Sequence, residues 1–213
     1  MRITNIACAV IISSACAASG GTSGEPAATP AAPRAQQQDT SALIPAGYGS
    51  LRQEEIALTL NTNGLIVRAL PLDDNFIRTL SPDSYRTMLG QRESKRAAID
   101  SIARRTGTQS VDLWYVSFFN EQPGEARFSP RDVLLTNQGR DFRPLEILPL
   151  TPGFGEYRVR QRQLHAAIYV FDGALDPNQV LTLAVETTRG GDWQTVLLRV
   201  ERERATIRAR AGR

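Results

Sequence analysis

Residues 113–119 read Leu-Trp-Tyr-Val-Ser-Phe-Phe, and this stretch decides the class of fold. Apolar side chains occupy odd and even positions alike, so a strand formed here buries both of its faces. Most of its residues are aromatic or β-branched, the types that favour strands. A strand that is apolar on both faces lies in the middle of a sheet. We therefore expect a β-rich domain in which residues 113–119 form a central strand.

Further apolar runs, separated by turn residues, lie on both sides of this strand. Upstream, Asn61-Thr62-Asn63-Gly64 separates two such runs, and Asn-Gly in this position is a strong hairpin signal. Downstream, a turn is expected at Asn137-Gln138-Gly139. The expected strands are 54–60, 65–70, 133–135, 145–148, 166–171, 180–185 and 193–200. Short strands at this spacing predict an antiparallel β-sandwich.

One segment has the features of a helix instead. Ser81 is a suitable N-cap, Pro82 fits the first helical position, and Gly107 provides a terminator. The polar middle of the segment leaves open two short helices or one helix with exposed central turns. We expect this helical insertion at about residues 82–106, within a β-sandwich domain that spans residues 46–204.

A family resemblance adds to this pattern. Residues 128–142 read Phe-Ser-Pro-Arg-Asp-Val-Leu-Leu-Thr-Asn-Gln-Gly-Arg-Asp-Phe, and a later strand ends in Val170-Phe171-Asp172. Both resemble the strands of telokin-like, immunoglobulin-like domains of bacterial exported lipoproteins. The resemblance covers about residues 111–202. It implies an immunoglobulin-like sandwich in a cell-envelope setting and no catalytic residues, whereas the N-terminal hairpin and the helical insertion depart from it.

The first residues have the layout of a secretory signal. Arg2 precedes a short apolar run, and small residues at 13–15 precede Cys16. The apolar run is far shorter than the roughly 20 residues that span a bilayer. We therefore expect residues 1–16 to be a signal segment and the protein to be exported to the cell envelope.

Cys16 resembles the acylated cysteine of bacterial lipoproteins, which implies membrane anchoring through a lipid on this residue. Ser13 stands where a Leu-like residue is usual, so conventional cleavage after Ala17 is the first alternative and an uncleaved segment the second. Cys8 is the only other cysteine, so the domain has no disulfide and no thiol nucleophile. Residues 17–45, rich in Ala, Pro, Gly, Ser and Gln, predict a disordered tether.

The formal net charge of +3 is unevenly placed. Residues 199–213 hold six arginines and two glutamates, a net +4, which leaves −1 for the rest of the chain. A nearly neutral body argues against a nucleic-acid partner, which requires clustered basic residues. We expect a basic tail at residues 205–213. The first interpretation of this end is a solvated last strand with a frayed terminus, and contact with anionic polymer or lipid head groups is the alternative.

No catalytic, metal or cofactor motif stands out. His165 is the only histidine, and no Gly-x-Ser-x-Gly turn accompanies it. Asp172–Asn178 carries three oxygen-bearing side chains but lacks the spacing of a calcium loop, and the pair Asp73-Asp74 is expected in a solvated loop. We expect no catalytic, metal-binding or cofactor-binding residues. A carboxylate pair for glycoside hydrolysis remains open, because it requires only the right separation in space.

A partner would use a sheet edge, the loops or the helix at 82–106, and two aromatic residues are candidates for such contact. The aromatic residues on the apolar strands are expected in the core. Phe154 and Tyr157 lie instead in a turn-rich stretch, residues 151–157, and are the candidates for partner contact.

These features favour a non-enzymatic binding or assembly module, tethered to a membrane through Cys16, whose partner is an unknown envelope protein or polymer. The alternative is an exported hydrolase that acts on envelope polymer. A third hypothesis is a calcium- or polyanion-binding domain.

Overall fold

The computed structural model describes residues 44–108 and 110–211. The expected signal segment, Cys16 and tether residues 17–43 lie outside this range. Ile44 is already buried, and its carbonyl accepts a hydrogen bond from Arg78 at 3.0 Å, so the folded domain begins by this residue. No helix within the described ranges is long and apolar enough to cross a membrane.

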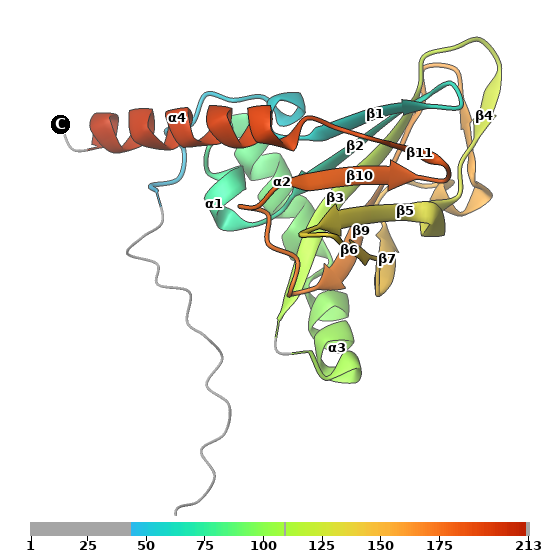
Figure 1. The fold of residues 1–213 in the computed structure, drawn as a ribbon, viewed down its shortest axis with the longest axis horizontal. Coiled ribbons are helices and arrows are strands. Elements are labelled where there is room, and N and C mark those ends of the chain that lie inside the picture. The colour runs from blue at the N-terminus through green and yellow to red at the C-terminus, as the bar shows by residue number, and fades with distance from the viewer. Residues whose placement is uncertain (1–43, 109, 212–213) are drawn as a thin grey trace, which may run out of the picture. The chain divides into compact units, whose positions relative to one another are not determined.

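The larger sheet has five antiparallel strands in the order β1-β2-β3-β9-β7 (Figure 1). Its strands are β1 (Leu58–Thr62), β2 (Leu65–Pro71), β3 (Val111–Asn120), β9 (Leu164–Asp172) and β7 (Glu146–Pro149). Strand β3 is central, with Trp114 opposite Pro71 of β2 and Tyr169 of β9. The expected position of residues 113–119 is confirmed.

A two-residue turn joins β1 to β2, as the sequence predicts. Asn63 and Gly64 both have positive φ, 50° and 78°. This is the conformation of the tight hairpin turn whose twist matches that of the flanking strands, and Asn and Gly adopt it with least strain. The hairpin fixes the register in which Leu60 lies opposite Val67.

The second sheet has four antiparallel strands in the order β11-β10-β5-β6. They are β11 (Thr188–Gly190), β10 (Leu181–Val185), β5 (Val133–Asn137) and β6 (Arg140–Phe142). The turn expected at 137–139 is confirmed, since Gln138 and Gly139 have φ of 51° and 77° between β5 and β6. A separate pair joins β4 (Glu125–Arg127) to β8 (Arg158–Arg160).

The two main sheets enclose one hydrophobic core. Strand β3 contributes Trp114, Val116 and Phe118, which alternate along the strand and are fully buried. Alternate residues of β5 and β10 belong to the same apolar cluster: Val133, Leu135, Leu181 and Leu183. The mainly antiparallel β-sandwich with an inserted helical segment is confirmed. The immunoglobulin-like family resemblance stays a prediction.

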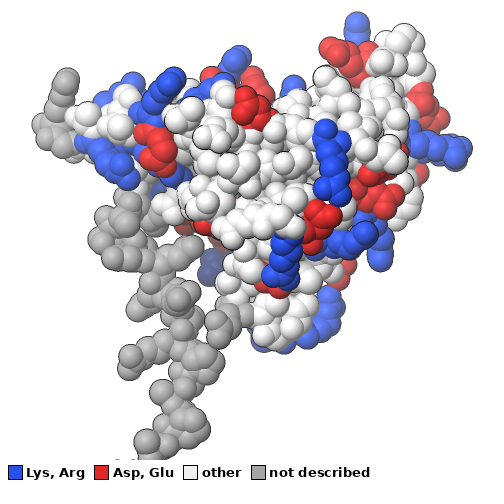
Figure 2. Space-filling view, in the orientation of Figure 1, with Lys and Arg blue, Asp and Glu red and all other residues white. Residues whose placement is uncertain are grey.

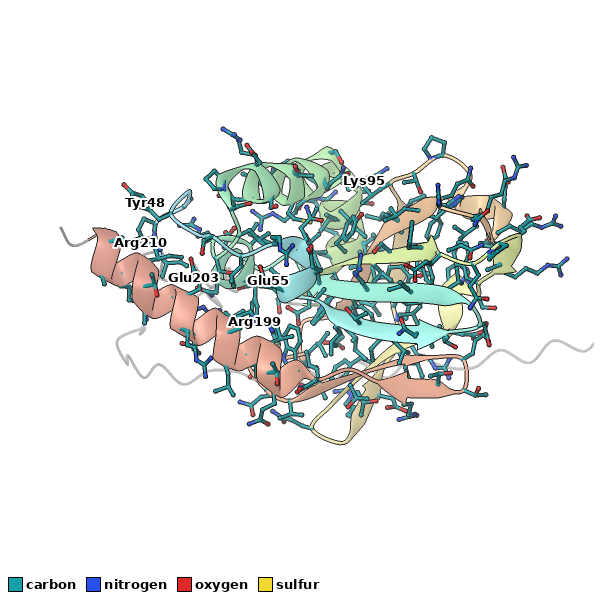
Figure 3. All side chains as sticks on the ribbon, turned by 90° about the horizontal axis from the view of Figure 1, so that it is seen from above. Tyr48, Glu55, Lys95, Arg199, Glu203 and Arg210 are labelled. Atoms are coloured by element: carbon teal, nitrogen blue, oxygen red, sulfur yellow. The ribbon has the colours of Figure 1, made fainter. Side chains whose placement is uncertain are left out.

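The inserted segment consists of two helices and lies on the outer side of the five-stranded sheet (Figures 1 and 3). Helix α2 (Pro82–Ser94) follows a short helix, α1 (Asp74–Ile77), and α3 (Arg96–Thr106) follows α2. Lys95 separates α2 from α3, and Gly107 ends α3 with φ 65°. Of the two arrangements that the sequence leaves open, the structure has two short helices.

The last element corrects the sequence-based expectation. Residues 193–200, expected as a strand, begin helix α4 (Trp193–Ala211), which also takes in residues 205–211 of the expected tail. Asp192 caps the helix by accepting from the Thr195 backbone N–H at 3.1 Å, and this side chain's bonds lower the pKa of Asp192. The buried positions follow helical spacing: Trp193, Val196, Val200, Glu203, Arg204 and Ile207. Burial of this stripe outweighs the strand propensity of the individual residues.

Candidate functional site

The described part of the chain contains a cleft of about 810 Å³. Its walls come from β7, the end of β4 and start of β8, and two short 3₁₀ turns, η3 (Pro130–Asp132) and η4 (Phe154–Glu156). Four arginines line it: Arg127, Arg131, Arg143 and Arg158. Apolar side chains lie between them, including Leu145, which is 39% exposed.

A packed aromatic cluster supports the floor of this cleft. The rings of Phe118 and Phe128 stack with centroids 4.3 Å apart, and Phe154 meets Phe128 edge-on at 5.3 Å. Phe154 is only 3% exposed. Phe154 is therefore not exposed as its turn-rich setting suggests, and burial of its ring against Phe128 stabilises the η4 turn. Its role in partner contact stays a prediction.

Tyr157 has the exposure expected of a contact residue. Its side chain is 52% exposed at the cleft, with the ring edge-on to Phe128 at 6.1 Å. Its φ is 57°, in the left-handed region that a bulky side chain rarely adopts. Such a conformation costs on the order of 1–3 kcal/mol and persists because the surroundings impose it. Here the backbone is held by a 3.1 Å hydrogen bond from the Phe128 N–H to the Tyr157 carbonyl.

The cleft carries uncompensated positive charge. Among the described residues, Arg127, Arg131 and Arg143 are exposed and take part in no ion pair, while Arg158 approaches Glu125 only to 3.9 Å. Glu146, one of two acids in the lining, is held by Arg105 of α3 at 2.8 Å. Three guanidinium groups thus remain available to a ligand in the cleft.

The backbone of β7 offers little to a binding strand. β7 is the edge strand of the five-stranded sheet, pairing with β9 alone. It is four residues long and ends in Pro149, which has no N–H to donate. A short edge that carries proline resists further strand pairing. Recognition in the cleft therefore falls to the side chains, chiefly the arginines and Tyr157.

His165 lies behind the cleft and is not arranged for catalysis. It is the second residue of β9, buried, opposite Phe118 of β3. Its Nδ1 has no hydrogen-bond partner among the described atoms, whereas a catalytic histidine is oriented by a carboxylate at this atom. Its ring packs 6.2 Å from Phe128 and close to Gly153, where a Cβ would come within 3.1 Å of it.

The acidic residues singled out in the sequence cap turns. Asp172 and Asp176 accept from the backbone N–H groups of Ala174 and Asn178, at 3.0 and 2.9 Å. Asp73 is the N-cap of α1 rather than part of a solvated loop, and its pKa is raised by burial. No group of three or more potential ligands close enough to hold a metal ion occurs within residues 44–108 and 110–211.

Asp112 is an unusual acid that the sequence analysis did not single out. It lies on β3, partly buried, and its Oδ2 has no hydrogen-bond partner within the described part. Burial, reinforced by the charges of Asp73, Asp176 and Asp172, raises its pKa to about 7. A lone acid in a strand that is apolar on both faces was the available signal in the sequence.

Comparisons with models of protein families, with curated proteins and with solved structures found no match to this chain. The cleft is therefore interpreted from its own geometry and charge.

Proposed function

We propose that this protein is a non-enzymatic binding module of the cell envelope, tethered to a membrane through a lipid on Cys16, and that its cleft binds an acidic segment of a partner protein. The observation that carries the proposal is a set of three arginines that form no ion pair among the described residues and share one cleft with an exposed, conformationally strained Tyr157. Strain of this kind concentrates at functional sites.

The composition of the cleft favours an acidic polypeptide. Guanidinium groups bind carboxylates in bidentate geometry, which gives orientation as well as charge complementarity. Leu145 and Tyr157 offer exposed apolar surface between the arginines, suited to apolar side chains of the same ligand. The volume of about 810 Å³ is enough for a few residues of an extended chain.

The hydrolase alternative has one observation in its favour, because the cleft contains two carboxylates, Glu146 and Glu156. Glu146 is occupied by Arg105 at 2.8 Å, and Glu156 is exposed. A glycosidase requires an acid kept protonated by its surroundings beside an ionised partner. Neither carboxylate is enclosed in the cleft as an unpaired acid, so we favour binding.

Fluorescence anisotropy with a labelled peptide of alternating Glu and Leu tests the cleft. Replacing Arg131 and Arg143 by Gln removes two charges at exposed sites and should weaken binding about tenfold, since each exposed ion pair contributes roughly 0.5–1 kcal/mol. The matched control replaces Arg202 and Arg208 of α4, also exposed and without ion pairs among the described residues. Equal affinity for the cleft variant and the wild type would refute the proposal.

The anchor has its own test. Mass spectrometry of the mature protein from a host that lipidates exported proteins should show a chain that begins at Cys16 and carries acyl groups. An unmodified N-terminus at Ala18 would contradict the lipid anchor and leave the cleft proposal untouched.

A further inference from the structure

Helix α4 is hydrogen-bonded to residues 48–55, the segment by which the chain enters the domain (Figure 3). Glu203 accepts from both the backbone N–H and the hydroxyl of Ser50, each at 2.9 Å. Arg210 donates to the Tyr48 carbonyl at 3.2 Å, and Arg199 donates to the Glu55 carbonyl at 2.6 Å. The first described residues thus run along α4, and the expected tether joins the domain beside this helix.

The cleft lies toward the other end of the domain. In Figure 1, α4 extends at one end, whereas β4 and β7, which contribute to the cleft, lie toward the opposite end. A membrane that contacts α4 would therefore leave the cleft accessible to a partner.

The exposed side of α4 is basic. Arg202 and Arg208 are exposed and form no ion pair within the described ranges, and Arg210 is half exposed beside Glu203 at 3.9 Å. The exposed acid of this helix, Glu201, is already bound by the buried Arg204. Figure 2 shows basic side chains along α4 with acidic ones among them.

The neighbouring exposed residues also suit an interface with lipid head groups. Tyr48 is 50% exposed beside Arg210, and Leu198 is 53% exposed on α4. Tyrosine is enriched where protein meets the head-group region of a membrane. The apolar stripe of α4 is buried against the core. Contact of the helix with a membrane would therefore be electrostatic and at the level of the head groups, without insertion of the helix.

We propose that the exposed face of α4, with Tyr48, docks on anionic phospholipid head groups and orients the cleft away from the membrane. The inference rests on the proposed membrane tether, because the chain enters the domain beside α4. Anionic lipid head groups fit this face by charge, because exposed arginines without ion pairs are attracted to the negative surface potential of anionic lipids.

Vesicle co-sedimentation with residues 17–213, which contain the complete core and no lipid, separates docking from anchoring. We compare vesicles of 30% phosphatidylglycerol in phosphatidylcholine with vesicles of phosphatidylcholine alone. The wild type should bind the anionic vesicles and release them in high salt. Replacing Arg202 and Arg208 by Gln should weaken binding about 25-fold, since each cation near an anionic surface contributes roughly fivefold.

The matched control is the cleft variant, Arg131→Gln with Arg143→Gln, which should retain most vesicle binding. Equal loss in both variants, or equal binding to both kinds of vesicle, would overturn the assignment of α4. Because the protein in this assay carries no lipid, failure of docking is distinguishable from failure of the lipid anchor, which mass spectrometry of Cys16 reports.

Discussion

Replacing Asp112 by Asn should stabilise the protein at pH 8 and leave its stability almost unchanged at pH 4. The side chain lies on β3 with an Oδ2 that finds no hydrogen-bond partner in the described structure, and burial raises its pKa from 3.8 to about 7. Asparagine has nearly the same shape and no charge. The substitution therefore removes the ionised form while keeping the packing.

The sign follows from linkage between protonation and folding. An acid whose folded pKa is raised contributes most to stability while it is protonated, below about pH 4, and loses that contribution as the pH rises to about 7. A shift of about three pKa units corresponds to at most about 4 kcal/mol. Because Asp112 is partly exposed, solvent screening reduces this figure, and we expect about 2 kcal/mol.

Urea unfolding at pH 4, 6 and 8 measures the difference. For Asp112→Asn we expect a gain of about 2 kcal/mol at pH 8, equivalent to a rise of about 4–8 °C in Tm for a domain of this size. The control is Asp100→Asn on the exposed face of α3, which removes one carboxylate from a position where the side chain is not buried. A variant that is less stable than the wild type at pH 8 would refute the assigned cause of the shift.

Three further substitutions test other parts of the structure. Gly49→Ala places a Cβ 2.2 Å from the Thr79 carbonyl oxygen, so the entry segment must move, and thermal unfolding should show a loss of about 1–3 kcal/mol. Trp193→Phe keeps an aromatic ring beside Phe76 but loses the 2.8 Å bond from Nε1 to the Pro177 carbonyl, which should cost about 1–2 kcal/mol in urea unfolding. In Tyr157→Asn the new residue suits the left-handed backbone at φ 57°, so the Tm should change little. Fluorescence anisotropy should show several-fold weaker peptide binding, and unchanged binding would show that Tyr157 is not part of the site.

Local signals in the sequence were enough for most of the sheet architecture. The Asn63-Gly64 turn specifies a two-residue hairpin because both positions require positive φ. The two-faced apolar pattern of residues 113–119 places β3 at the centre of its sheet. Pro82 and Gly107 bound the helical insertion because each acts on the backbone alone.

Helix α4 was missed because its residues give conflicting signals. Trp193, Val196 and Val200 have strand propensity, and their helical spacing is a weaker signal than an unbroken apolar run. Glu203 and Arg204 complete the buried stripe, yet charged residues in a sequence predict exposure. Their burial is compensated by partners distant in the chain, Ser50 and Asn75, which no local pattern reveals.

The candidate site depended still more on tertiary structure. Tyr157 could be selected from its turn-rich setting, but Phe154, three residues earlier in the same stretch, packs inward against Phe128. The arginines of the cleft come from segments far apart in the sequence, such as Arg131 and Arg158. The pairing of β4 with β8, which the sequence did not predict, sets Arg127 opposite Arg158.

The most direct test of the proposed function is to map an acidic peptide on the protein by NMR. Residues 17–213, labelled with ¹⁵N, are titrated with the unlabelled Glu-Leu peptide in moderate salt. We expect the largest amide shifts around the cleft, at Arg131, Arg143, Leu145 and Tyr157. Shifts confined to α4, or no saturable shifts at the cleft, would contradict the proposal that the cleft is the binding site.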